Sequence, residues 1–298
     1  MRLFTVADRL MIASSAGLVD VEIASAGRFT ADPHSAYERW DEFRTWASGH
    51  VETETQAVDP SRLGVPVPRP RQVFAIGLNY IDHAGESGFA VPTEPVVFTK
   101  FLSSFTGPAG KIVLPPGNVD WEVELVAVIG RTGKNVSEDR AWSHVAGLTV
   151  GQDLSERASQ MSGPAPQFSL AKSFPGFTPM GPAVVTVDEL ADPDDLAIEC
   201  SINGEIVQSG RTSQMVFPIP ELIARLSRVV TLRPGDLLFT GTPPGVGMGR
   251  RPQRFLKAGD VVESRIEGLG HMRHEFIAAA ADPAPVEGAP VGVGSSSG

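Results

Sequence analysis

The sequence predicts a strand-rich α+β fold, and three observations support this expectation. Short runs rich in β-branched residues, each bounded by turn residues, recur from Gln72 to about Ile277. The dipeptide Asn203-Gly204 separates two alternating stretches and indicates a β-hairpin. One clear helix extends from about Pro218 to Ser227, with its apolar residues on one face. The expected strands are Val73–Ile76, Pro95–Lys100, Val123–Ile129, Gly147–Val150, Ala183–Val187, Ile198–Val207 and Asp236–Thr240.

The chain divides into three parts. Residues 1–68 are predicted to form a small α/β module, whose clearest element is a helix over Pro33–Trp46 with Asp32 as its N-cap. Residues 72–277 carry the strand-rich region and every candidate functional residue. Residues 278–298 are rich in Ala, Pro, Gly and Ser and have no periodic apolar face, so we expect a disordered tail.

The composition argues against several classes of function. The 298 residues include 25 Lys and Arg against 35 Asp and Glu, and the net charge of −10 disfavours binding to nucleic acid or to an anionic membrane surface. No run approaches the ~20 apolar residues that span a bilayer, and we find no secretion signal. The single cysteine, Cys200, excludes an internal disulfide and a cysteine-rich zinc site. We therefore expect a cytoplasmic protein.

Two glutamates in an apolar strand form the most specific local pattern. In the segment DWEVELVAVIG, Glu122 and Glu124 are two residues apart, so in a strand both point to one face while Val123 and Leu125 point to the other. Neighbouring carboxylates repel each other unless a cation or protons lie between them. A solvated strand face explains most such pairs, but the apolar neighbours make exposure less natural here.

Asp153 is the third acidic candidate. It follows the apolar stretch Gly147–Gln152, at a strand end where polar groups often point into a cleft. Alternatively, it caps the segment that follows it. Three carboxylates without Cys or His indicate a hard cation, namely Mg²⁺, Mn²⁺ or Ca²⁺, rather than zinc.

A histidine pair and a lysine are candidate catalytic groups. If a short helix begins at Asn79 or Tyr80, His83 and Glu86 lie at positions i and i+3 and can form a hydrogen bond, which would help the histidine to activate water. A weak surface pair is the alternative. Lys172 lies among apolar residues, where its charge either extends to solvent or faces an anion.

Three further polar residues are candidates for contact with a ligand. Arg157 and Gln160 follow Asp153 at a spacing that suits one face of a short helix, and Arg157 either binds a substrate carboxylate or forms a surface salt bridge. The glycine-rich segment Phe239–Gly249 lacks the lysine of a phosphate-binding loop and contains two prolines without backbone donors. We interpret it as a turn that places Thr242 at a strand end, near a bound ligand.

Together these segments resemble the fumarylacetoacetate hydrolase family. The resemblance covers roughly Val73 to Phe276. Two motifs depart from the commoner family sequence, because GQDLSER replaces ANDVSAR and SFPGF replaces SFDTF. The matching motifs are, in order, GLNYIDHAGE (Gly77–Glu86), DWEVELVAVIG (Asp120–Gly130), GQDLSERASQ (Gly151–Gln160), KSFPGFTPMGP (Lys172–Pro182), NGE (Asn203–Glu205) and PGDLLFTGTPPGVG (Pro234–Gly247).

The resemblance implies a mixed β-roll catalytic domain and a homodimer. It implies that Mg²⁺ or Mn²⁺ is bound by three acids: Glu122, Glu124 and Asp153. It places a water-activating pair, His83 and Glu86, on a lid, and Lys172 beside the metal. It assigns substrate contacts to Arg157, Gln160 and Thr242.

The residues and the resemblance together predict a metal-dependent hydrolase. It would cleave a C–C bond in a 2,4-dioxo acid of acylpyruvate or fumarylacetoacetate type through a metal-chelated enolate, with His83 deprotonating the water and Lys172 offsetting charge at the attacked carbonyl. The alternative is a decarboxylase, isomerase or hydratase that acts on a related 2-oxo acid, such as oxaloacetate or an aromatic ring-fission product. A third hypothesis is a non-catalytic module stabilised by Ca²⁺, which would need neither the histidine pair nor the lysine.

Overall fold

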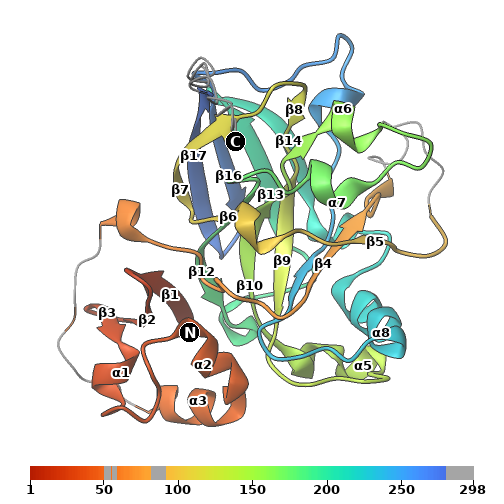
Figure 1. Ribbon diagram of the computed structural model, residues 1–298. Helices are drawn as coiled ribbons and strands as arrows, with labels where there is room; N and C mark the ends of the chain where they lie inside the picture. The colour runs from red at the N-terminus through yellow and green to blue at the C-terminus, as the bar shows by residue number, and fades with distance from the viewer. Residues whose placement is uncertain (50–54, 56–58, 82–91, 280–298) are drawn as a thin grey trace, which may run out of the picture.

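The computed structural model describes residues 1–49, 55, 59–81 and 92–279, and its largest element is a ten-stranded mixed sheet (Figure 1). The strands of this sheet are β1 (Arg2–Val6), β2 (Arg9–Ser14), β3 (Gly17–Asp20), β4 (Val73–Gly77), β5 (Val96–Phe98), β6 (Phe105–Thr106), β9 (Val123–Ile129), β10 (Val145–Gln152), β12 (Thr178–Val185) and β15 (Leu237–Phe239). Their order is β3-β2-β1-β12-β10-β9-β15-β4-β5, and β6 pairs with β12. The strands β9 and β10 therefore lie in the middle of the sheet.

A second sheet packs against the first. It has the order β14-β13-β16-β17-β7. Its strands are β7 (Ala109–Leu114), β13 (Ala197–Ile202), β14 (Glu205–Arg211), β16 (Val261–Ile266) and β17 (Gly270–Ala278), while β8 (Val119–Asp120) pairs separately with β11 (Ser155–Glu156).

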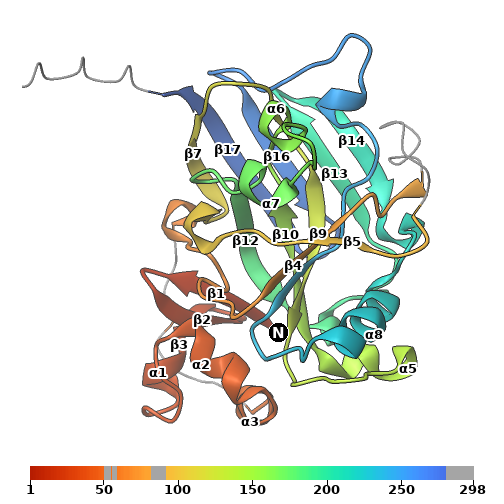
Figure 2. The same cartoon turned by 45° about the vertical axis from the view of Figure 1, so that its right-hand side comes forward.

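The helices are short and lie around the sheets (Figure 2). Among the described residues the longest is α8, with 11 residues, and none is long and apolar enough to cross a bilayer. They are α1 (Val21–Ala24), α2 (Pro33–Glu38), α3 (Trp40–Ala47), α5 (Glu138–Ala141), α6 (Arg157–Gln160), α7 (Phe168–Ala171) and α8 (Ile219–Val229).

The alternation of residues along β9 fixes which side chains reach which layer. Leu125 and Ala127 belong to the core between the two sheets, together with Ile198 of β13 and Val262 of β16. Val126 and Val128 face the opposite side and join a second core under the N-terminal module, residues 1–68. Because every residue of β9 is buried, the register of this strand is strongly constrained.

The N-terminal module extends the large sheet rather than standing apart from it. Strand β1 pairs with β12 in antiparallel fashion, with Leu3 opposite Val184. Trp40 of α3 lies directly on the backbone of Gly130, where a Cβ atom would be only 2.6 Å from the indole Cδ1. Backbone pairing and aromatic packing thus hold the module on one face of the sheet.

The predicted fold class is confirmed. The predicted strand over Val123–Ile129 matches β9, and the Asn203-Gly204 dipeptide forms the turn between β13 and β14 with both residues at positive φ, 53° and 83°. The predicted helix over Pro33–Trp46 is wrong in one respect, because it is broken into α2 and α3 at Arg39 (φ −122°, ψ 40°). There the guanidinium binds Glu42 and lies 4.8 Å from the ring centroid of Phe29.

The predicted strand over Ala183–Val187 is displaced toward the N-terminus, since β12 spans Thr178–Val185 and Val187 starts a 3₁₀ turn. Strands β16 and β17 were not expected from the sequence. Their buried residues alternate with exposed charged ones such as Glu263 and Arg265, so no continuous apolar run marks them. The expected disordered tail over 278–298 lies almost entirely outside the described residues.

His274 of β17 should make the fold sensitive to acid. Its ring is 2% exposed, its Nε2 donates to the Gly107 carbonyl at 2.9 Å, and burial lowers its pKa from 6.5 to about 4. Between these two values the unfolded chain binds a proton that the folded chain does not, so the free energy of unfolding should fall as the pH drops through this window. His274→Gln should remove most of this pH dependence, which amounts to about 3 kcal/mol.

Urea unfolding at a series of pH values between about 4 and 7 measures the effect. His271→Gln is the matched control, because His271 lies on the same strand but is exposed. Equal pH slopes for His274→Gln and the unmodified chain would contradict the prediction.

Candidate metal centre

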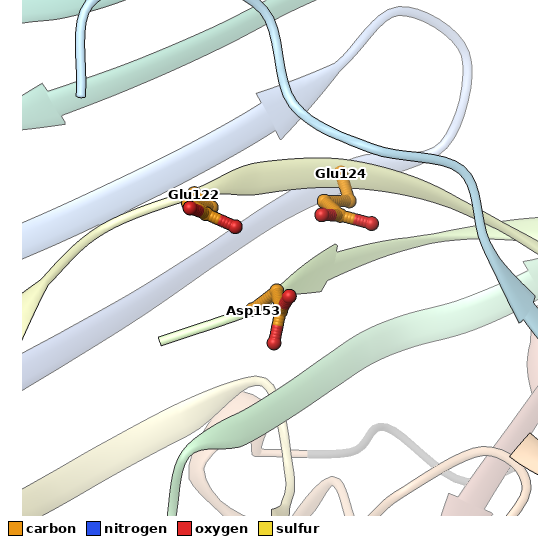
Figure 3. A group of neighbouring side chains, drawn as sticks. All are labelled: Glu122, Glu124 and Asp153. Carbon is orange, nitrogen blue, oxygen red and sulfur yellow. The ribbon is translucent and has the colours of Figure 1, made fainter. Parts of the chain in front are cut away.

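Three acidic side chains meet at adjoining ends of β9 and β10. Glu122 directly precedes β9, Glu124 lies within it, and Asp153 directly follows β10. The strand pairing continues to this point, since Asp153 N donates to Glu122 O at 2.9 Å. One carboxylate oxygen from each residue lies within 4.8 Å of the other two, and Figure 3 shows the three groups turned toward a common space. The structure thus brings together the three acids that the sequence singled out.

The three acids are buried, and their negative charges repel one another. Glu122, Glu124 and Asp153 are 6%, 1% and 0% exposed. Burial, followed by the negative charges of Asp153 and Glu122, raises the pKa of Glu124 well above its usual value. A divalent cation between these oxygens would relieve that repulsion.

Lys172 binds two of the three acids. It caps α7, and its Nζ donates to Glu122 Oε2 and to Asp153 Oδ2, each at 2.7 Å. Burial acts to lower the pKa of Lys172, but the charges of Asp153 and Glu122 outweigh it and the pKa is raised. Of the two alternatives for this lysine, the structure therefore supports the one in which it faces an anion.

Lys100 is a second buried lysine that sequence reasoning missed. Its Nζ donates to Asp153 Oδ1 and to the backbone carbonyl of Lys172. Burial lowers its pKa despite the charge of Asp153. The available signal was its place at the end of the apolar run Pro95–Lys100, since a lysine in such surroundings needs a partner.

Arg157 lies in the same cluster and does not form a surface salt bridge. It is 6% exposed, and it donates through Nε to Asp120 Oδ2 at 2.8 Å and through Nη2 to Glu122 Oε1 at 2.7 Å. Its Nη1 donates to Gln160 Oε1 at 2.9 Å, so the short helix α6 holds both residues side by side as expected. Asp120 is another buried residue that sequence reasoning missed, and it also accepts from Gly247 N at 2.7 Å.

The glycine-rich segment closes the cluster from the β15 side. Gly241 N donates to Glu124 Oε2 at 2.9 Å, and its φ of +91° and the approach of Asn79 Cβ, 2.7 Å from any added Cβ, require glycine there. Thr242 is buried, donates to Val123 O at 2.8 Å and accepts from Gln208 Nε2 at 2.8 Å. The predicted turn that places Thr242 beside the site is present.

One pocket connects most of these groups. Six polar residues line it: Glu122, Glu124, Arg157, Gln160, Lys172 and Thr242. Gly77 and six residues with apolar side chains complete the lining: Ile76, Leu78, Phe98, Met161, Phe168 and Met248. The predicted pair His83 and Glu86 lies outside the described residues, so its role stays a prediction.

The residues of the cluster fit a hard divalent cation. Carboxylate oxygens are the donors that Mg²⁺ and Mn²⁺ prefer. Within the described part of this cluster, four buried carboxylates face three cationic groups, so their formal charges sum to −1. The acids are Asp120, Glu122, Glu124 and Asp153, and the cations are Lys100, Arg157 and Lys172.

Glu124→Gln should affect stability and metal binding in opposite directions. The change removes one of the repelling charges and preserves the shape, so it should raise the free energy of unfolding of the metal-free protein by about 1 kcal/mol. It replaces an anionic ligand by a neutral amide, so Mn²⁺ affinity should fall by at least ~100-fold.

Urea unfolding in the presence of a chelator and calorimetric titration with Mn²⁺ measure the two effects. Glu263→Gln, on the exposed side of β16, is the matched control and should change neither. Unchanged Mn²⁺ affinity in Glu124→Gln would exclude this residue as a ligand.

Comparison with known proteins identifies the family. Residues 72–277 match the family model described as the C-terminal domain of fumarylacetoacetate hydrolase. The human mitochondrial oxaloacetate tautomerase FAHD2A is 53% identical over 207 residues, which is 69% of this chain and 66% of that protein. The chain thus spans slightly less than two thirds of that relative. A 2,4-didehydro-3-deoxy-L-rhamnonate hydrolase from Sphingomonas sp. (strain SKA58) is 50% identical over 217 residues, 72% of this chain and 76% of that protein.

Solved structures agree in fold. A crystal structure of a protein described as HpcE from Mycobacterium smegmatis is 55% identical, with a TM-score of 0.91 over 94% of this chain and 100% of that one. Maleylpyruvate hydrolase from Sphingobium sp. SYK-6, in complex with manganese(II) and pyruvate, is 26% identical, with a TM-score of 0.75 over the same shares. The chain therefore belongs to the fumarylacetoacetate hydrolase family.

Proposed function

We propose that the chain is a divalent-metal-dependent enzyme that hydrolyses a C–C bond in a 2,4-dioxo acid of acylpyruvate or fumarylacetoacetate type. The observation that carries this proposal is the buried cluster of Glu122, Glu124 and Asp153 with Lys172 and Arg157 on its acids. A structural Ca²⁺ site would not need three cations, Lys100, Arg157 and Lys172, in contact with its ligands, so this arrangement favours an enzyme over a binding module.

The charges suit an anionic substrate. Counted over the described residues alone, the formal charges of the cluster sum to −1, and a bound divalent cation would bring this sum to +1. That favours binding of a 2-oxo acid, whose carboxylate is ionised at neutral pH. Mg²⁺ or Mn²⁺ would act as a Lewis acid there and polarise the 2-keto oxygen.

The side chains would divide the remaining tasks. We assign His83, steadied by Glu86, the removal of a proton from the attacking water. Lys172, whose ammonium is held between Glu122 and Asp153, offsets the negative charge that develops at the attacked carbonyl.

Binding of the substrate headgroup is assigned to three lining residues, Arg157, Gln160 and Thr242. Water adds to the 4-carbonyl carbon, the bond between carbons 3 and 4 breaks, and carbon 3 takes up a proton. The products are a carboxylic acid and a pyruvate-type 2-oxo acid.

Two named relatives support hydrolysis. The Sphingomonas relative, 50% identical, is named as a hydrolase, and the maleylpyruvate hydrolase structure is described as a complex with manganese(II) and pyruvate. The first name agrees with hydrolysis, and the second description agrees with a divalent metal and a pyruvate-type fragment in the proposed reaction. We further expect a homodimer and a cytoplasmic location for this chain.

A second candidate is the isomerisation of a related 2-oxo acid. The human relative, 53% identical, is named as an oxaloacetate tautomerase. The same headgroup binding and enolate chemistry would serve this reaction, but no water would attack a carbonyl. Product analysis separates the two, because hydrolysis yields two acids whereas tautomerisation changes only the keto-to-enol ratio.

His83→Ala should abolish hydrolysis and preserve metal binding. Loss of the proposed base should lower kcat for a 2,4-dioxo acid by at least ~100-fold, while the Mn²⁺ dissociation constant should change little, because the histidine is not a proposed ligand. Chromatographic detection of the two acids and calorimetric titration measure these quantities.

His271→Ala, an exposed histidine of β17, is the control. Hydrolysis by His83→Ala at the unmodified rate would refute the assigned role. If the unmodified chain with Mg²⁺ or Mn²⁺ releases no pair of acids but interconverts the oxaloacetate tautomers, the second candidate replaces the first.

A further inference from the structure

Two sets of residues with different chemistry line the pocket beside the acidic cluster, and we call them its polar wall and its apolar wall. The polar wall carries Glu122 and Glu124 with Arg157 and Lys172. The apolar wall is formed by residues that lie on or directly after β4, β5, α6 and α7 and in the glycine-rich segment. Its members are Ile76, Leu78, Phe98, Met161, Phe168 and Met248. Both α6 and α7, with the residue that caps each of them, thus contribute polar and apolar residues to the pocket.

The apolar wall lies next to the ammonium group of Lys172. The Nζ of Lys172 lies 5.1 Å from the ring centroid of Phe98. Phe98 and Phe168 form an edge-to-face pair with centroids 5.5 Å apart and an interplanar angle of 71°. Phe168 and Lys172 are separated by one turn of α7, so this helix presents the ring and the ammonium to the same pocket.

The apolar wall carries no cation for a second anionic group. Among the described residues that line the pocket, the cations are Arg157 and Lys172, and both are already bound to acids of the cluster. The sequence of residues 82–91, which lie outside the described part of the chain, contains neither lysine nor arginine. A carboxylate placed against the two phenyl rings would lose its water without gaining a partner.

We propose that this pocket selects 2-oxo acids whose chain beyond the reacting carbonyl is apolar, with Phe98 and Phe168 as the residues that determine this specificity. The inference rests on the proposed function, because the 2-oxo headgroup must bind at the acidic cluster if the carbon chain of the substrate is to extend over the rings. The substrate class is then an aliphatic or aromatic acylpyruvate rather than a dioic acid. Each methylene that the wall covers should raise kcat/KM by about 4-fold.

A matched pair of substrates tests the preference. The acids 2,4-dioxoheptanoate and 2,4-dioxoheptanedioate differ only in a terminal methyl or carboxylate, and the first should have a kcat/KM at least ~10-fold higher. Binding of 2-oxoheptanoate and 2-oxoheptanedioate to the Mn²⁺-loaded protein, measured by calorimetry, should show the same order. This second measurement does not depend on which reaction the enzyme performs.

Met161→Lys provides a test by substitution. Met161 lies at the end of α6, lines the pocket and is 47% exposed, so a lysine there can be accommodated and would supply the missing cation. The preference for the monoacid should fall to about parity, because the dioic acid gains an ion pair. Leu170→Lys is the matched control: Leu170 is 73% exposed on α7 and does not line the pocket, so the preference should stay unchanged.

The outcomes separate this inference from the function on which it rests. If 2-oxo acids bind but the unmodified protein favours the dioic acid, or if Met161→Lys leaves the preference unchanged, the specificity is wrong and the function stands. If the metal-loaded protein neither binds nor converts any of the four acids, the proposed function fails and the inference fails with it.

Discussion

The pairing of β9 with β10 is the constraint on which the site depends. Gly151 lies opposite Glu124, and the bond from Asp153 N to Glu122 O extends the ladder to the point where the acids meet. A shift of one residue along β9 would turn both glutamates into the core between the sheets and would turn Leu125 and Ala127 out of it. Apolar packing on both faces of β9 prevents that shift, so the hydrophobic cores hold the carboxylates at the pocket.

Burying so many charges is costly, and the structure offsets only part of the cost. Each acid that Lys172 or Arg157 contacts gains an ion pair in a region of low dielectric, while the pKa of Glu124 stays raised by burial and by its neighbours. Lys100 donates to one carboxylate oxygen of Asp153, and Lys172 donates to the other. Because the buried carboxylates repel one another, a bound cation would stabilise the cluster. The same repulsion that destabilises the metal-free fold would therefore contribute to metal affinity.

The sequence predicted correctly the features of the site that depend on neighbouring residues. The two-residue period of a strand places Glu122 and Glu124 on one face, and the structure has them so. Sequence reasoning failed where the determinant is a partner far along the chain. Lys100 contacts Asp153, and Asp120 contacts Arg157 and the glycine-rich segment at Gly247. No local spacing in the sequence reveals those contacts. The break at Arg39 is a different case, because the groups that its side chain contacts, Glu42 and Phe29, are only three and ten residues away.

The acids and the two phenyl rings of the pocket come from different elements, which separates the residues of the proposed reaction from those of the proposed specificity. The acids come from β9 and β10 in the centre of the sheet, where a change disturbs both cores. Phe98 and Phe168 come from an edge strand and from a four-residue helix, where a substitution disturbs less packing. If the proposed function holds, the fold fixes the headgroup chemistry, while the group that follows it can change with few substitutions. A fold built in this way can accommodate relatives named as tautomerases and as hydrolases of different acids.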